Sequence, residues 1–136
     1  NNDVYGGGNE AVVYGDTLVN VSSTKLNNVY GGGNQAEVTG SSTVIISNAN
    51  TIKNVYGGGN LAEVNENSTV IIEGSTKITN VYGGGNEANI NGDSTLNISS
   101  SNNISNIYGG GNAADIDGES IITIDSSTGS STILTW

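Results

Sequence analysis

The sequence of 136 residues lacks cysteine, histidine, methionine, proline, phenylalanine and arginine, and its only basic residues are Lys25, Lys53 and Lys77. Without histidine and cysteine the chain cannot build a Ser-His-Asp or Cys-His arrangement or a soft-metal site. The net charge of −10 leaves no basic patch and repels a phosphate backbone. No apolar run reaches the length of a membrane span. We therefore expect a non-enzyme with no catalytic residues, metal or cofactor, no nucleic-acid partner and no membrane insertion.

What the sequence has in abundance is repetition. The motif Val-Tyr-Gly-Gly-Gly-Asn begins at Val4, Val29, Val55 and Val81 and returns with isoleucine at Ile107, in steps of 25, 26, 26 and 26 residues. A period held this tightly is typical of a solenoid. We expect a single domain over 1–136, with repeats starting at 4, 29, 55, 81 and 107 and an irregular C-terminal tail over 129–136. Because the chain starts at Asn1 without methionine, we also expect it to be a mature or excised piece of a longer protein.

Within each repeat, apolar residues alternate with polar ones in short segments. In the third repeat these are Ala62-Glu63-Val64, then Val70-Ile71-Ile72, and finally the segment around Ile78. Period two indicates half-buried strands. The first and third residues of each triplet should point inward, and the first repeat fits if Val19 and Val21 are inward and Asn20 is outward.

The pattern predicts an all-β fold, a single-stranded parallel β-helix or β-solenoid, with three short strands per rung and about five rungs of 25–26 residues. Right-handed winding is favoured by the general handedness of parallel crossovers. The alternative is an antiparallel sandwich, which also has short strands joined by turns. A sandwich does not require the same residue at the same phase in five successive copies.

Two sets of glycines have structural interpretations. One column, occupied by Gly15, Gly40, Gly92 and Gly118 with Glu66 as the exception, suggests a corner with positive φ. The triple glycine resembles a phosphate cradle only weakly, because the residues that follow it form a strand pattern and not a helix. We interpret it as close-packed backbone where no Cβ fits.

Asparagine occupies two columns of the repeat. Stacked amides can hydrogen-bond along the solenoid axis, so we predict a structural ladder and not a ligand site. The residues of the ladder are Asn9, Asn34, Asn60, Asn86 and Asn112, together with Asn28, Asn54, Asn80 and Asn106. A looser acidic column of Glu37, Glu63 and Asp115 is interpreted as a solvated face, with weak cation binding as the alternative.

A tyrosine follows the inward aliphatic residue in every repeat, and alternation places it on the outside. The row consists of Tyr5, Tyr30, Tyr56, Tyr82 and Tyr108. One interpretation is an aromatic ladder that stiffens this face. The other is a surface for binding sugar rings or another protein, which would make the chain a carbohydrate-binding module.

The run Val-Tyr-Gly-Gly-Gly-Asn-x-Ala-x-Val, with its glycine turn and Ser/Thr-Val-x-Ile strand, resembles repeat arrays in large adhesin-like surface proteins of gut bacteria and methanogenic archaea. The resemblance extends from Val4 to about Thr128. It implies an extracellular location, at a cell surface or in a matrix, and a stalk or fibre. We therefore expect a structural or adhesive solenoid whose partners are other copies, surface proteins or glycans.

The C-terminal residues depart from the repeat. Ile133, Leu134 and Trp136 fall where a sixth Val-Tyr-Gly-Gly is expected, and Trp136 occupies a glycine position. The segment is short, uncharged and β-prone, so it could add as a strand to a neighbouring molecule. We expect it to serve either as an assembly tail that bridges subunits of an axial filament or as a cap on its own chain.

Overall fold

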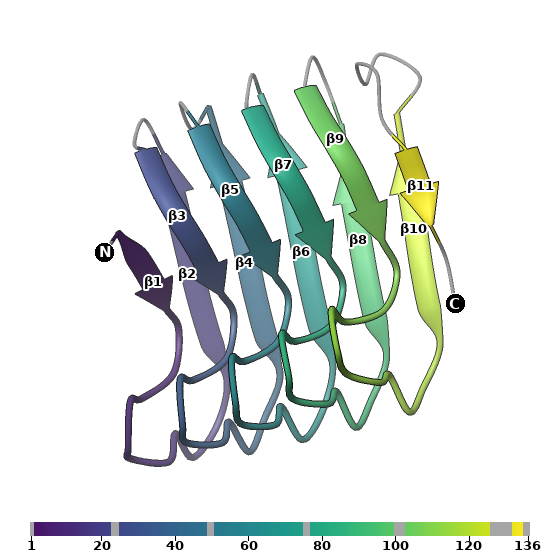
Figure 1. The fold of residues 1–136 in the computed structure, drawn as a ribbon. Coiled ribbons are helices and arrows are strands. Elements are labelled where there is room, and N and C mark those ends of the chain that lie inside the picture. Colours follow the sequence, from purple (N-terminus) through teal and green to yellow (C-terminus); the bar gives the residue numbers. More distant parts are fainter. Residues whose placement is uncertain are drawn as a thin grey trace.

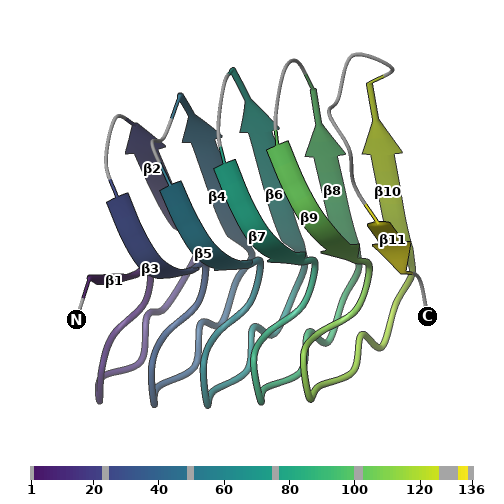
Figure 2. The ribbon, with the colours of Figure 1, turned by 45° about the horizontal axis from the view of Figure 1, so that its top comes forward.

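Successive turns of the chain stack into a parallel β-solenoid (Figure 1). The computed structural model describes residues 2–22, 25–48, 51–74, 77–99 and 103–125, and the backbone of 132–134. Each turn contributes one strand to each of two parallel sheets, and a loop segment closes the turn on the third side (Figure 2). Because all strand pairs are parallel, the antiparallel sandwich is excluded.

The two sheets contain alternate strands of the sequence. The six-stranded sheet has the order β1 (Asp3–Tyr5), β3 (Lys25–Tyr30), β5 (Thr51–Tyr56), β7 (Lys77–Tyr82), β9 (Asn103–Tyr108) and β11 (Thr132–Leu134). The five-stranded sheet has the order β10 (Ser120–Ile124), β8 (Ser94–Ile98), β6 (Ser68–Glu73), β4 (Ser42–Ser47) and β2 (Thr17–Ser22).

The register follows the sequence period. Thr17 pairs with Ser42, and the same column continues through Ser68, Ser94 and Ser120. These four steps, from β2 to β10, make a solenoid of about four turns where the sequence suggested about five rungs. Equivalent residues therefore lie one above another through the whole stack.

The expectation of three strands per turn is wrong. The Ala-x-Val segments form only isolated bridges, one residue per turn, between Val13, Val38, Val64, Ile90 and Ile116. Each segment is short because the triple glycine precedes it and a turn follows it at once. The apolar alternation was identified correctly, but it extends over too few residues for a ladder.

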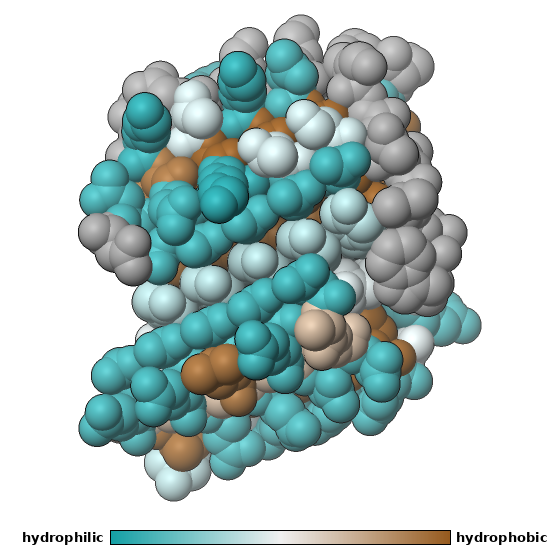
Figure 3. Space-filling model, in the orientation of Figure 1, coloured by the Kyte–Doolittle hydropathy of each residue, from teal (hydrophilic) through white to brown (hydrophobic). Residues whose placement is uncertain are grey.

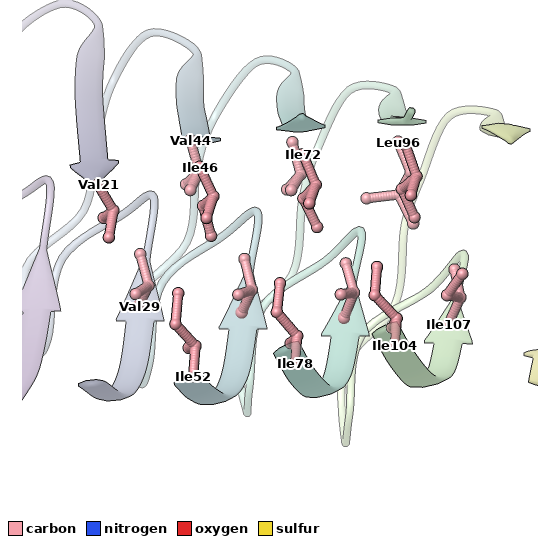
Figure 4. Close-up of a cluster of buried hydrophobic side chains, with 14 of the residues drawn as sticks. Val21, Val29, Val44, Ile46, Ile52, Ile72, Ile78, Leu96, Ile104 and Ile107 are labelled. Carbon is pink, nitrogen blue, oxygen red and sulfur yellow. The ribbon is translucent and has the colours of Figure 1, made fainter. Parts of the chain in front are cut away.

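The core lies between the two sheets and is aliphatic (Figure 4). Val44 and Ile46 of β4 and Ile52 of β5 are completely buried, and in Figure 4 such side chains from both sheets point toward one another. Val19 and Val21 are buried while Asn20 is exposed, as expected. A second cluster, of Val38, Val64 and Ile90, fills the space beside the loop segments.

The glycine corner differs from the expectation. Only Gly15 of that column has positive φ, at 126°. At Gly40, Gly92 and Gly118 a Cβ would instead meet the preceding turn. A Cβ on Gly40, for example, would lie 2.7 Å from the carbonyl oxygen of Gly15. Glu66 is accommodated in this column without positive φ. Its backbone nitrogen lies 3.2 Å from the carbonyl oxygen of Gly40, slightly farther than the 2.9 Å between the nitrogen of Gly40 and the carbonyl oxygen of Gly15.

Candidate functional site

The tyrosines form one continuous stack. The ring centroids of Tyr5, Tyr30, Tyr56, Tyr82 and Tyr108 are separated by 4.7, 4.8, 4.9 and 4.7 Å, and successive ring planes differ by 2° to 8°. The spacing is the strand separation, so the parallel register itself brings the rings face to face. The predicted aromatic ladder is confirmed.

The expectation that this row is exposed is wrong. Tyr30, Tyr56 and Tyr82 have only 5, 5 and 9% of their surface accessible, while Tyr5 and Tyr108 at the two ends are partly buried. Alternation does place the rings outside the aliphatic core, in a separate cluster. Stacking at this distance nevertheless covers both faces of each internal ring, and a sugar stacks on a face. The ladder therefore offers no platform for sugar rings.

No tyrosine hydroxyl of the ladder is both buried and unpaired. Among the described residues, the only buried side-chain polar atom without a hydrogen bond is Ser120 Oγ. Burial of the rings still raises the pKa of Tyr56 to about 12, with a smaller contribution from the charge of Tyr82. The pKa of Tyr30 is also raised, first by burial and then by Tyr56, Tyr5 and Asp3.

The raised pKa values predict loss of stability at alkaline pH. A tyrosine whose folded pKa exceeds its unfolded value of about 10 stabilises the fold fully below pH 10. That contribution is lost as the pH rises through the folded pKa, which is about 12 for Tyr56. We expect tyrosinate absorbance to rise and β-sheet circular dichroism to fall together between about pH 10 and 12. The double variant Tyr56→Phe/Tyr82→Phe should lose its structure at higher pH. Exposed Tyr14 can ionise without unfolding, so the prediction is contradicted only if the absorbance reaches its full change without loss of circular dichroism.

A single serine in the ladder should destabilise the fold. Tyr56→Ser removes two stacked contacts and opens a cavity, and we expect it to reduce the free energy of unfolding by about 2 kcal/mol. Tyr56→Phe keeps the stack and should change stability by less than about 0.5 kcal/mol. Tyr14→Ser is the matched control, because Tyr14 lies outside the ladder and is 87% exposed. Chemical denaturation measures all three, and equal effects of the two serine variants would show that stacking contributes nothing.

The two asparagine columns form the predicted ladders. In each column the Nδ2 of one residue donates to the Oδ1 of its equivalent one turn earlier. The distances are 2.6, 2.8, 2.8 and 2.9 Å from Asn9 to Asn112, and 2.8, 2.8 and 2.9 Å from Asn28 to Asn106. Because every Nδ2 donates toward the N-terminal end, the first asparagine of a ladder has an Nδ2 with no asparagine before it. That end of the ladder therefore needs a hydrogen-bond acceptor and no donor.

Asp3 supplies that acceptor. Its Oδ1 accepts bonds from the backbone nitrogen of Asn28 at 3.0 Å and from Asn28 Nδ2 at 3.1 Å. A carboxylate has no donor to leave unpaired there. From the sequence alone the first turn has no obvious cap, because Asp3 stands in an asparagine column and resembles an imperfect copy of the repeat.

A column of buried hydroxyls was missed from the sequence. Thr17 Oγ1 donates to the carbonyl oxygen of Gly31 at 2.6 Å, and Ser68 Oγ donates to that of Gly83 at 2.6 Å. Ser42 and Ser94 make the same bond to Gly57 and Gly109. These bonds tie the starts of β2, β4, β6 and β8 to the glycines of the next turn, whereas Ser120 at the start of β10 makes no such bond. The signal was present: Ser or Thr always stands two residues before the first inward aliphatic residue.

The triple glycine is close-packed backbone, as predicted. The amide of Gly7 donates to the carbonyl oxygen of Gly32 at 3.0 Å, and that of Gly32 donates to Gly58 at 3.1 Å. A Cβ on Gly32 would lie 2.8 Å from the nitrogen of Gly59. These amides are engaged between turns, so they are not directed at a phosphate.

The acidic column of Glu37, Glu63 and Asp115 is exposed. Over the described ranges no three or more acidic side chains gather as a group that could hold a metal ion. In the same part of the chain no helix is long and apolar enough to cross a membrane.

The tail contains a short strand, β11. Ile133 pairs with Ile107 and Leu134 with Tyr108, so β11 takes the register of a sixth repeat beside β9 of its own chain. The segment expected to be irregular therefore includes three residues of regular strand. Trp136 lies outside the described residues.

No family model, curated protein or solved structure matches the chain. Function is therefore inferred from the residues and their geometry alone.

Proposed function

We propose that this protein is a structural or adhesive β-solenoid, a repeat unit of an extracellular stalk or self-assembling filament, and that it is not an enzyme. The observation that carries the proposal is the continuity of its ladders. Amides, tyrosine rings and aliphatic side chains each repeat at one position through successive turns. Such an architecture multiplies one surface along an axis, as a stalk or fibre requires.

The location belongs to the same proposal. The resemblance of the Val-Tyr-Gly-Gly-Gly-Asn repeat to adhesin-like surface proteins supports a cell-surface or matrix role. Right-handed winding is also proposed, from the general preference of parallel crossovers. The tyrosine row does not support carbohydrate binding, because neighbouring rings cover the faces of the internal rings.

Axial self-association is supported by strand edges at both ends of the stack. In the five-stranded sheet, β2 and β10 each pair on one side only, and unpaired parallel edges are templates for another chain. In the six-stranded sheet β11 covers the edge of β9, so a neighbouring copy would pair with β11 there. At this end the six-stranded sheet extends one strand beyond the five-stranded sheet. A neighbouring copy therefore cannot continue both sheets at the same level, and β11 acts as a cap.

Electron microscopy of the purified chain tests the proposal, with a variant that lacks residues 131–136. We expect the parent to form short or sparse filaments and the truncated variant to form longer ones, because the two sheets then end level. Filaments that disappear on truncation would identify the tail as a bridge. If both samples showed only single, unassembled solenoids at high concentration, the proposal of self-assembly would be wrong.

A further inference from the structure

The charges of the molecule are separated by side. Lys25, Lys53 and Lys77, the only basic residues, all lie in the six-stranded sheet, in β3, β5 and β7, and all are exposed. None of them forms an ion pair with a described residue. In a chain of net charge −10, this lysine side is the one positively charged surface of the described structure.

The acidic residues gather on another side. We call the segments 9–16, 34–41, 60–67, 86–93 and 112–119 the loop side. It holds ten of the 13 acidic residues and no lysine. The ten, all exposed, are Glu10, Asp16, Glu37, Glu63, Glu66, Glu87, Asp93, Asp115, Asp117 and Glu119.

The lysine side is also hollowed. An open depression there is lined by Lys25, Lys53, Leu26 and polar residues of β3, β5 and β7. Leu26, which is partly buried and packs against the core, contributes apolar surface to the lining of this depression. Figure 3 shows hydrophobic surface between hydrophilic side chains on this side of the molecule.

The loop side carries an exposed apolar side chain beside acidic residues. Leu61 is 51% exposed there. Glu87 occupies the equivalent position one turn later, and exposed Glu63 follows two residues along the chain. An apolar side chain close to two carboxylates thus complements a depression lined by two lysines and Leu26.

We infer that the lysine side of one copy binds the loop side of a second copy, with Leu61 of one molecule seated in the depression lined by Lys25 and Lys53 of the other. The spacing of charges supports this match. Lys25 and Lys77 occupy equivalent positions two turns apart, as do Glu63 and Asp115. Two turns correspond to about 9–10 Å on both sides, at the usual separation of neighbouring strands.

This contact joins two different surfaces, so a pair of copies keeps one free surface of each kind and association can continue. Five strands by six residues give a face of roughly 480 Å² per copy, about three fifths of what a stable dimer buries per partner. A single contact is therefore weak, and its strength grows with the number of turns. The inference rests on the proposed self-associating role, but it uses the sides of the solenoid and not its ends.

Two variants test the inference. The lysine variant is Lys25→Gln/Lys53→Gln/Lys77→Gln, and the loop variant is Leu61→Ser/Glu63→Gln/Glu87→Gln. Sedimentation velocity over a concentration series in about 0.1 M salt is suitable, because repulsion between the two net charges is then screened beyond about 10 Å. To separate lateral from axial contacts, the same series is run in the chain that keeps its tail and in the chain without residues 131–136. Axial association is expected to differ between these two backgrounds, whereas the loss caused by the substitutions on the sides should be the same in both.

We expect the parent to grow with concentration in both backgrounds and each variant to associate at least about tenfold more weakly. A mixture of the two variants retains one intact pair of surfaces, the lysine side of the loop variant and the loop side of the lysine variant. The mixture should therefore pair laterally one to one, without further growth through this lateral contact. No symmetric, same-surface dimer behaves in this way.

Leu18→Ser is the matched control, because Leu18 is 61% exposed but lies on the five-stranded sheet. It should leave association unchanged, and circular dichroism should show all variants folded. A parent that stays monomeric, a lysine variant that associates like the parent, or a mixture that stays monomeric overturns the inference. So does a loss confined to the lysine variant, which would point to an acidic partner other than this loop side. A lysine variant that associates like the parent contradicts the lateral contact and leaves axial filaments possible, whereas a parent that stays monomeric contradicts both, so the two failures are distinguishable.

Discussion

Replacing Ile72 with asparagine should unfold the middle of the solenoid. Ile72 is completely buried, and its column continues through Ile46 and Ile98 in the turns on either side. The substitution removes aliphatic packing and leaves an amide without partners among aliphatic side chains. Together these effects should lower the free energy of unfolding by about 4–6 kcal/mol, a large part of the total for a domain of this size. Ile46→Asn should act in the same way.

Ile71→Asn is the matched control. Ile71 is the neighbouring residue of the same strand and points away from the core. Its partner in β8 is Asn97, so asparagine already occupies this column. Chemical denaturation should show a change of less than about 1 kcal/mol for Ile71→Asn. If Ile72→Asn melted within a degree or two of the parent, the inward assignment of its column would be wrong.

Gly58→Ala should destabilise the protein by about 3 kcal/mol, the second largest effect that we expect. A Cβ at this position would lie 2.6 Å from Ile90 Cδ1, 2.9 Å from the nitrogen of Gly85 and 3.0 Å from its Cα. The isoleucine tip can move, but the backbone of Gly85 cannot move without stretching hydrogen bonds between turns. The amide of Gly58 itself donates to the carbonyl oxygen of Gly84 at 3.2 Å.

Gly15→Ala separates this clash from a purely conformational cost. No atom lies within 4 Å of a Cβ on Gly15, but its φ is 126°, which a residue with a Cβ rarely adopts. We expect a loss of only about 1 kcal/mol there, from the backbone alone. Thermal or chemical unfolding compares the two variants, and equal losses would show that contact between turns does not explain the triple glycine.

Much of the fold follows from the period of the sequence. A spacing of 25 or 26 residues stacks like residues on like, so the aliphatic columns, the asparagine ladders and the need for glycine could all be deduced from the repeat. Ile52, Ile78 and Ile104 illustrate this, because one column identified from the sequence is buried in every turn where the pattern is complete. Inward and outward positions follow from the two-residue period of a strand.

The tertiary structure decided which segments become strands and what stacking does to a surface. Val38 is as apolar and alternating as Val44, yet it forms only an isolated bridge, because the turns on both sides of it leave too little extended backbone. Tyr56 points away from the aliphatic core, as the alternation indicated, but it is buried because rings 4.8 and 4.9 Å away cover both its faces. Alternation gives the direction of a side chain and not the distance to its neighbours. Alternation likewise indicates that Ser68 points inward but does not identify its partner. The hydrogen bond from Ser68 Oγ to the carbonyl oxygen of Gly83 in the next turn depends on how the turns pack in three dimensions.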